Sequence, residues 1–161
     1  MQTSIPKNIN NSSKEEKYIL LKQQAKALLE GENNIIANMA NLSALIKEIF
    51  NWFWVGFYIS DENGDLVLGP FQGPIACTRI SFGKGVCGQA AQQQKVIIVS
   101  DVDKYSGHIS CNSNSKSEIV VPYIKDNKTQ FVLDIDNDLL NSFNATDSRH
   151  LSEVVQLLSS E

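Results

Sequence analysis

The sequence lacks any apolar stretch long enough to cross a membrane, and its N-terminal segment MQTSIPKNINNSSKEEK contains no apolar signal core. A spanning helix needs about 20 mostly apolar residues, so we expect neither a membrane span nor secretion. Basic residues are also few: 14 lysines and arginines stand against 18 aspartates and glutamates, for a net charge of -4. Nucleic-acid surfaces require clustered positive charge, so we expect no nucleic-acid partner.

Cysteine is scarce as well, with only Cys77, Cys87 and Cys111. In a chain without a secretion signal we expect a cytoplasmic location, where cysteines are free or transiently paired, and an odd count leaves one thiol over. No C-x2-C pair occurs, and the separations of ten (77 to 87) and twenty-four (87 to 111) residues fit no common zinc site, even with His108 as a fourth ligand. The sequence therefore predicts no metal site.

The length of 161 residues suits one well-packed core and is too short for two ordinary domains. We expect a flexible tail over residues 1–13 and one domain over residues 14–161. Apolar residues at helical spacing predict two N-terminal amphipathic helices and one C-terminal helix, whose stripes cover a sheet or a dimer partner. Ser13 is the expected cap of the first helix and Thr146 that of the last.

Strand signals fill the middle of the chain, where two hairpin turns are expected at Asn63-Gly64 and Asp126-Asn127. The glycines and prolines of residues 69–74 are expected to interrupt the pairing. Together these elements predict an α+β fold, with a central antiparallel sheet of about five or six strands flanked by the N- and C-terminal helices. The predicted strands cover residues 51–60, 65–71, 78–82, 96–100, 118–124 and 129–136.

The segment GKGVCG, residues 83–88, satisfies the G-x-G-x-x-G pattern of dinucleotide-binding proteins. The predicted helix after it is short, and Asp101 comes too early for the acid expected about 20 residues on. We therefore interpret these glycines as a tight turn between a strand and a helix.

Cys111 lies in the small, polar stretch GHISCNSNSKSE, which indicates an accessible thiol in a functional loop. Glu118 follows where this loop becomes a strand. Asp134 and Asp136 are two residues apart, so on a strand both point to one face. Crowded carboxyl groups raise at least one pKa, which provides a proton donor near neutral pH. The nearby His108 leaves a cysteine-hydrolase option open, although we interpret it as a loop-ordering residue.

Aromatic residues in NWFWVGFY and a histidine near the C-terminus complete the candidates. On a regular strand Trp52 and Trp54 would share one face. We expect Trp52 to pack in the core. His150, on the predicted last helix, is expected to be solvated.

Five motifs occur in a fixed order along the chain. They are Cys77 in GPFQGPIACTRI, Cys87 in GKGVCGQA, Cys111 in GHISC, SEIVVP with Glu118, and VLDID with Asp134 and Asp136. In their order and spacing the sequence resembles a known family, the free methionine-(R)-sulfoxide reductases, which are built on a single GAF domain. The resemblance runs from about Ala37 to the C-terminus and implies a GAF domain over residues 14–161. It also implies thiol-dependent reduction of free L-methionine-(R)-sulfoxide to L-methionine, a repair of oxidative damage.

The resemblance assigns roles to these residues. Cys111 is expected to attack the sulfoxide sulfur and become a sulfenic acid, which condenses with a second cysteine. Cys77 or Cys87 resolves it, or Cys87 relays the disulfide outward, and thioredoxin is the expected external reductant, with no bound cofactor. A homodimer is expected. The acids Glu118, Asp134 and Asp136 are expected to hold the sulfoxide oxygen and donate protons, and they join Trp54 and Tyr58 as substrate-binding residues.

The sequence departs from the family pattern at Ser110, Asn112 and Phe131. Phe131 stands where a glycine usually precedes the VLDID strand, so an aromatic ring there is expected to narrow the pocket or repack the sheet. Two other classes remain open alternatives: a non-enzymatic GAF module that senses a small ligand, and a dimeric interaction protein. Only an enzyme would lose two thiols for each methionine formed.

Overall fold

A computed structural model describes residues 4–159 of the chain. The first three residues of the expected tail and the last two of the expected domain lie outside the described residues. Among the described residues, no helix combines the length and apolar character that a membrane span requires. The helices are α1 (Lys14–Leu29), α2 (Ile35–Phe50), α3 (Gly85–Gln93) and α4 (Ala145–Gln156), with short 3-10 turns at Ile9–Asn11 and Val102–Lys104.

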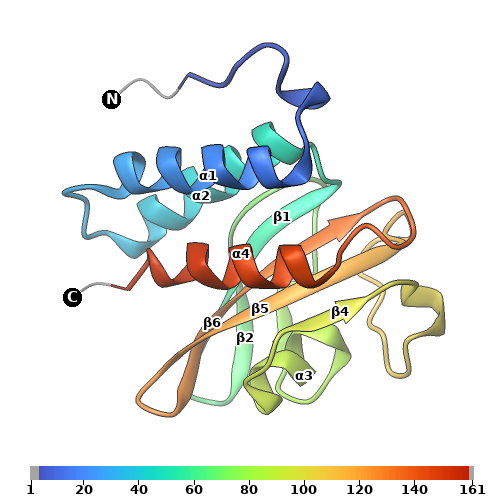
Figure 1. Ribbon diagram of the computed structural model, residues 1–161. Helices are drawn as coiled ribbons and strands as arrows, with labels where there is room; N and C mark the ends of the chain where they lie inside the picture. The colour runs from blue at the N-terminus through green and yellow to red at the C-terminus, as the bar shows by residue number, and fades with distance from the viewer. Residues whose placement is uncertain (1–3, 160–161) are drawn as a thin grey trace.

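Six antiparallel strands form one sheet in the order β3-β2-β1-β6-β5-β4 (Figure 1). This confirms the predicted α+β fold and its antiparallel sheet. Helices α1, α2 and α4 cover one face of the sheet, and α3 packs on the other. The strands are β1 (Trp54–Ser60), β2 (Asp65–Gln72), β3 (Arg79–Ser81), β4 (Ile97–Val99), β5 (Ser117–Lys125) and β6 (Lys128–Asn137).

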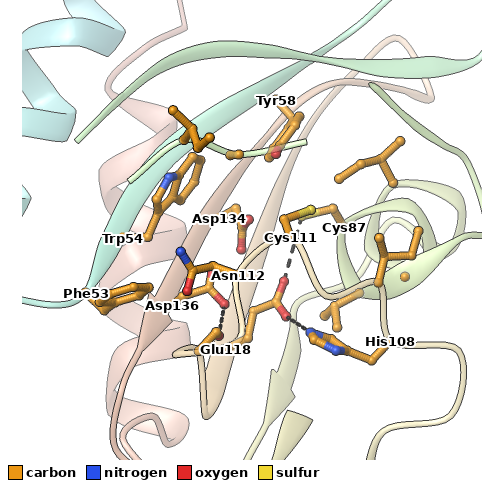
Figure 2. A pocket seen from close by; sticks show the side chains of 17 residues that line it. Phe53, Trp54, Tyr58, Cys87, His108, Cys111, Asn112, Glu118, Asp134 and Asp136 are labelled. Carbon is orange, nitrogen blue, oxygen red and sulfur yellow. Dashed lines mark hydrogen bonds and ion pairs between the residues drawn. The ribbon is translucent and has the colours of Figure 1, made fainter. Parts of the chain in front are cut away.

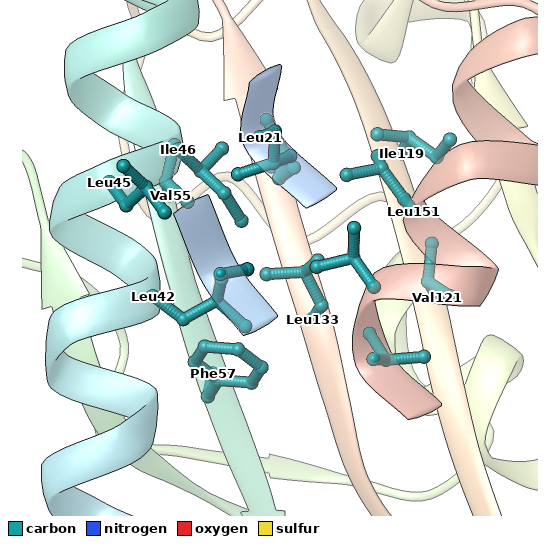
Figure 3. Packing of buried hydrophobic residues seen from close by; sticks show 14 of the residues in the cluster. Leu21, Leu42, Leu45, Ile46, Val55, Phe57, Ile119, Val121, Leu133 and Leu151 are labelled. Atoms are coloured by element: carbon teal, nitrogen blue, oxygen red, sulfur yellow. The ribbon is translucent and has the colours of Figure 1, made fainter. Parts of the chain in front are cut away.

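The main core fills the space between the sheet and helices α1, α2 and α4. Alternate residues of β1, β5 and β6 point into this core, because successive side chains of a strand face opposite sides. Figure 3 shows them meeting the apolar stripes of the helices. The other face of the same strands meets α3 and the connecting loops, and that face carries the polar side chains described below. Residues of the main core include Leu21, Leu42, Ile46, Val55, Phe57, Ile119, Leu133 and Leu151.

Side-chain caps begin the first and last helices, and a buried acid joins these two helices. Ser13 and Glu16 form the predicted capping box of α1. The last helix is capped by Asn144 and not by Thr146, whose backbone amide instead donates to the Asn144 side chain. Asp147 is fully buried and accepts hydrogen bonds from Tyr18 Oη at 2.6 Å and Lys14 Nζ at 2.7 Å. A carboxylate with these partners ties α1 to α4.

The prediction that His150 is solvated is wrong. Its side chain is 4% exposed, because the ring stacks on Tyr18 with 4.6 Å between centroids. Its Nε2 atom lies 2.9 Å from Glu15 Oε1. His150 lies one position before Leu151 of the apolar stripe, and the Tyr18 ring of α1 covers it.

The first thirteen residues include a short ordered turn. The 3-10 turn Ile9–Asn11 buries Ile9 against the main core, and Ile5 packs beside it. Flexibility of the tail stays a prediction.

The glycines and prolines of residues 69–74 interrupt the pairing of β1 with β2, as expected. Gly69 and Pro70 fall in a bulge where the register shifts between Gly56 and Tyr58, and β2 ends at Gln72. At a bulge a proline has no ladder hydrogen bond to lose.

The expectation that Trp52 and Trp54 share a face is wrong. The strand β1 begins only at Trp54, after Asn51 adopts a left-handed conformation with φ 54°. Trp52 therefore packs in the main core, as expected for that residue.

Candidate active site

Three carboxyl groups meet on the α3 side of the sheet. Glu118 of β5 pairs with Asp136 of β6, and Asp134 lies two residues along on the same face of β6. Figure 2 shows the three carboxyl groups turned toward one cavity. Glu118 is 5% and Asp134 is 6% exposed. The structure thus brings together the three acids that the sequence analysis selected.

Burial and mutual repulsion raise the pKa of every acid in this cluster. Burial, followed by the neighbouring Asp134 and Asp136, holds the pKa of Glu118 well above its ordinary value. Burial raises the pKa of Asp134 to about 6, and burial with Asp134 nearby raises that of Asp136. Buried like charges cannot all ionise at neutral pH. At least one of these groups therefore keeps a proton near pH 7.

A disulfide between Cys77 and Cys111 borders the same cavity, with 5.5 Å between the Cα atoms. Cys77 lies in the loop between β2 and β3, and Cys111 lies in the loop that leads into β5. Both residues are only partly buried. The long polar loop predicted around Cys111 thus carries a sulfur that reaches a second sulfur across the cavity.

Cys87 is a free, buried thiol at the base of the cavity. It lies on the first turn of α3, and its Sγ donates a long contact of 3.9 Å to Glu118 Oε1. Burial, followed by the charges of Asp134 and Glu118, raises the pKa of Cys87 well above its ordinary value. A thiol in this environment is protonated at neutral pH, and so is a poor nucleophile.

The G-x-G-x-x-G segment shapes the turn that carries Cys87. Gly83 donates its backbone N–H to Gly88 O at 2.8 Å. A Cβ atom on Gly88 would lie 2.2 Å from Ser81 O, so only glycine lets α3 approach β3 this closely. The structural interpretation of these glycines is confirmed.

Two aromatic residues of β1 form one wall of the cavity. Trp54 Nε1 donates to Pro74 O at 3.0 Å, and Tyr58 Oη donates to Cys77 O at 2.9 Å. Both rings therefore also hold the loop that presents Cys77. Gly56 leaves room for the indole, because a Cβ there would meet Trp54 at 2.5 Å.

Several lining residues escaped the sequence analysis. Ser115, in the Cys111 loop, is buried and its hydroxyl donates to Asp136. Phe53, Ile75 and Ile109 add apolar surface to the cavity. No sequence signal distinguishes Ser115 from the other small polar residues of its loop, and its position at the cavity becomes visible only in the folded structure. His108 was expected to order the loop, and its Nε2 lies 3.7 Å from Glu118 Oε2.

Of the two effects expected of Phe131, narrowing of the pocket does not occur, because the residue is not among those that line the cavity. It points to the opposite face of β6, where its ring stacks on Tyr123 with 4.7 Å between centroids and meets Phe57 edge-on at 5.8 Å. The strand alternation that turns Asp134 toward the cavity turns Phe131 away from it. Its ring fills the main core.

The cavity is small, with a volume of about 40 Å³. This is room for about three or four water molecules, at about 10–15 Å³ each. A free amino acid with a sulfoxide side chain needs considerably more space.

Comparison with known proteins agrees with this site. The family model described as "GAF domain" matches residues 39–160. A curated protein of Dictyostelium discoideum, GAF domain-containing protein A, is 57% identical over 93% of this chain and 95% of its own. The free methionine-R-sulfoxide reductase of Saccharomyces cerevisiae is 42% identical over 92% of this chain and 87% of its own.

A solved structure extends the match to three dimensions. The free methionine-R-sulfoxide reductase of Neisseria meningitidis, in complex with its substrate, is 47% identical, covers 91% of this chain and 89% of its own, and superposes with a TM-score of 0.89. The fold, and the cavity on the α3 side of this protein's sheet, define a GAF-domain protein with a disulfide beside that cavity. Within that class, the chain belongs to the free methionine-R-sulfoxide reductase family.

Proposed function

We propose that this protein reduces free L-methionine-(R)-sulfoxide to L-methionine. The observation that carries the proposal is the Cys77–Cys111 disulfide at the edge of a cavity lined by three buried acids with raised pKa values. Reduction of a sulfoxide by thiols needs a nucleophilic sulfur on one side and an acid for the departing oxygen on the other. The relatives from yeast and from Neisseria meningitidis are both named free methionine-R-sulfoxide reductase, which supports the proposal.

The reaction proceeds in two steps. The Cys111 thiolate attacks the sulfoxide sulfur, and the oxygen passes to Cys111, which leaves methionine and a sulfenic acid. The Cys77 thiol then attacks the sulfenic sulfur, expels water and closes the disulfide. Two electrons have moved from the two cysteine sulfurs to the substrate. Cys77 is the resolving cysteine because it is the one that the fold presents to Cys111.

The acids supply the protons and hold the substrate. Glu118 is the proton donor to the sulfoxide oxygen, since its pKa is raised well above 4.5. Asp134, with a pKa of about 6, and Asp136 carry the negative charge that meets the substrate ammonium. A free amino acid brings this ammonium close to its α-carbon. A peptide-bound residue brings a neutral amide instead and leaves a buried charge unpaired, so the pocket rejects it.

Trp54 and Tyr58 form the wall against the substrate methyl group. A sulfur near an aromatic ring gains about 0.3–1.5 kcal/mol. Cys87 remains protonated and serves as a hydrogen-bond donor that orients Glu118, 3.9 Å away. It takes no part in the disulfide cycle.

Thioredoxin reopens the disulfide, because a dithiol of its reduction potential can reduce a partly exposed disulfide. This step leads us to place the protein in the cytoplasm, where such dithiols are kept reduced. The cycle requires no bound cofactor.

We further infer a homodimer formed through the N-terminal helices. Ile19 on α1 is 58% exposed, and Ile35 and Ile36 at the start of α2 are 37% and 49% exposed. A second copy would cover these apolar side chains. Light scattering should give twice the monomer mass at micromolar concentration, and Ile36→Lys should lower it. A monomeric wild type would exclude this interface.

The activity is tested by offering the reduced protein free methionine sulfoxide in the R form, the S form and a peptide-bound R form, with dithiothreitol as reductant. We expect rapid turnover of the free R form alone. Cys111→Ser is the matched inactive variant. Binding of the sulfoxide without formation of methionine would instead indicate a sensor, and comparable rates with the peptide would contradict the proposed pocket.

A further inference from the structure

Three donor atoms of different chemistry converge at the base of the cavity. The Cys87 sulfur and one carboxylate oxygen each from Glu118 and Asp134 all lie within 4.8 Å of one another. These side chains are 3%, 5% and 6% exposed. They come from three different elements, α3, β5 and β6, so the fold brings them together and not their positions in the sequence.

A second observation is independent of this grouping. Asp134 Oδ1 is buried and has no hydrogen-bond partner among the described residues. A buried carboxylate oxygen without a partner costs several kcal/mol in an apolar environment. It faces the space that the other two donors border (Figure 2). The structure therefore contains an open coordination position next to a sulfur and a second carboxyl group.

We propose that Cys87, Glu118 and Asp134 form a binding site for a thiophilic divalent cation, Zn²⁺ in particular. Zinc binds cysteine sulfur at about 2.3 Å and carboxylate oxygen at about 2.0–2.2 Å, in a tetrahedron. Donors at these distances are about 3.3–3.8 Å apart. Cys87 Sγ and Glu118 Oε1 are 3.9 Å apart, and all three donor atoms lie within 4.8 Å of one another. Three protein ligands leave the fourth position to water, as in open zinc sites.

The cavity is large enough for a metal ion. Its volume of about 40 Å³ admits a metal ion with one or two waters. Two carboxylates and a thiolate together supply the negative charge that a divalent cation neutralises, which removes the repulsion within the cluster. His108, whose Nε2 lies 3.7 Å from Glu118 Oε2, offers a nitrogen at the same edge.

This site differs from a zinc site built on the three cysteines. Cys77 and Cys111 are joined to each other, so neither is available as a thiolate in this state. Cys87 is the remaining free thiol. The other two ligands are carboxyl groups, which do not belong to any cysteine-based zinc motif. Metal binding is therefore independent of the disulfide.

The inference goes beyond the proposed function, because it predicts binding of an ion that the reduction does not need. It also has a consequence for that function. A cation on Glu118 and Asp134 displaces the proton of Glu118 and occupies the position of the substrate ammonium, so Zn²⁺ inhibits in competition with the sulfoxide.

The disulfide form of the protein tests the site without reference to catalysis. In this form Cys87 is the only free thiol of the chain's three cysteines. Titration with Co²⁺ is expected to produce a thiolate-to-cobalt charge-transfer band in the near ultraviolet, which saturates at one equivalent and is abolished by Zn²⁺. Absence of this band in the folded wild type would overturn the proposal.

Variants then assign the donors. Cys87→Ala should remove the cobalt band, and Asp134→Asn should weaken Zn²⁺ binding at least tenfold, since even supporting contacts contribute about 10–100-fold to metal affinity. Glu62→Gln, at an exposed turn residue, makes the same kind of change away from the cavity and should bind as the wild type does. Circular dichroism checks that each variant is folded. Equal Zn²⁺ affinity in wild type and folded Cys87→Ala would also overturn the site, whether or not the protein reduces methionine sulfoxide.

Discussion

Glu118 on β5 stands directly opposite Asp136 on β6, and both carboxyl groups face the cavity bordered by Cys111. Like charges at opposed positions of a sheet destabilise it by about 0.2–1 kcal/mol in the usual exposed case. Here burial adds to the repulsion and raises both pKa values. The pair is therefore costly for folding, and the proposed proton donation accounts for its presence.

The first prediction concerns stability and pH. The pKa of Asp134 is about 6 in the folded protein against an ordinary 3.8, so the folded state binds its proton more tightly than the unfolded state. Binding of this proton contributes on the order of 3 kcal/mol to the free energy of unfolding, at about 1.4 kcal/mol per pKa unit. The contribution is fully present below pH 3.8 and is lost as the pH rises through 6.

This prediction is measured by denaturant unfolding of metal-free protein between pH 4 and pH 8. Asp134→Asn is the matched variant, because it removes the titrating group at nearly the same volume. Relative to the variant, the wild type should lose stability as the pH rises. A constant difference between the two proteins would contradict the raised pKa.

Glu118→Gln should separate chemistry from folding. Loss of the proton donor lowers kcat by about a hundredfold or more. Glutamine replaces a protonated, uncharged carboxyl group with a neutral group of nearly the same volume, so the free energy of unfolding should change by less than about 1 kcal/mol. Steady-state kinetics and denaturant unfolding measure the two quantities. An active Glu118→Gln protein would exclude Glu118 as the donor.

The two remaining cysteines should behave differently from each other. Cys77→Ser should form one equivalent of methionine and then stall as a sulfenic acid, because nothing resolves it when thioredoxin is the only reductant. Cys87→Ala should turn over repeatedly at a reduced rate, since Glu118 loses only a hydrogen-bond donor. Trapping with a sulfenic-acid reagent identifies the stalled form. The opposite pattern would make Cys87 the resolving residue.

The two tryptophans provide a paired test of the cavity wall. Trp54→Phe removes the hydrogen bond to Pro74 and part of the wall, so kcat/KM should fall by about tenfold or more, which is about 1.4 kcal/mol. Trp52→Phe changes only the main core, and should lower stability by about 1–2 kcal/mol with kcat/KM unchanged. Equal kinetic effects in both variants would remove Trp54 from the site.

Much of this site could be predicted because strand alternation is a local rule. The spacing of Asp134 and Asp136 fixes a shared face once β6 is recognised, and the polar composition of the Cys111 loop marks it as functional. The pairing of β5 with β6 then places Glu118 beside them. Short hairpins preserve such patterns, so sequence reasoning works there.

Local rules failed where a strand began later than its sequence pattern indicated and where distant segments met. The strand β1 begins only at Trp54, so strand alternation does not extend back to Trp52. His150 is buried by Tyr18, which is 132 positions earlier (150 − 18). Contacts between distant helices and loops, including that of Ser115 with Asp136, leave no local pattern in the sequence.

The central claim is that Cys111 and Cys77 together reduce the sulfoxide. The most direct measurement mixes reduced protein with one equivalent of free L-methionine-(R)-sulfoxide, without an added reductant. Alkylation under denaturing conditions and peptide mass spectrometry then locate the surviving thiols. We predict one methionine per chain, a Cys77–Cys111 disulfide and an alkylated Cys87. Formation of methionine with Cys87 in the disulfide, or with all three thiols still free, would contradict the account.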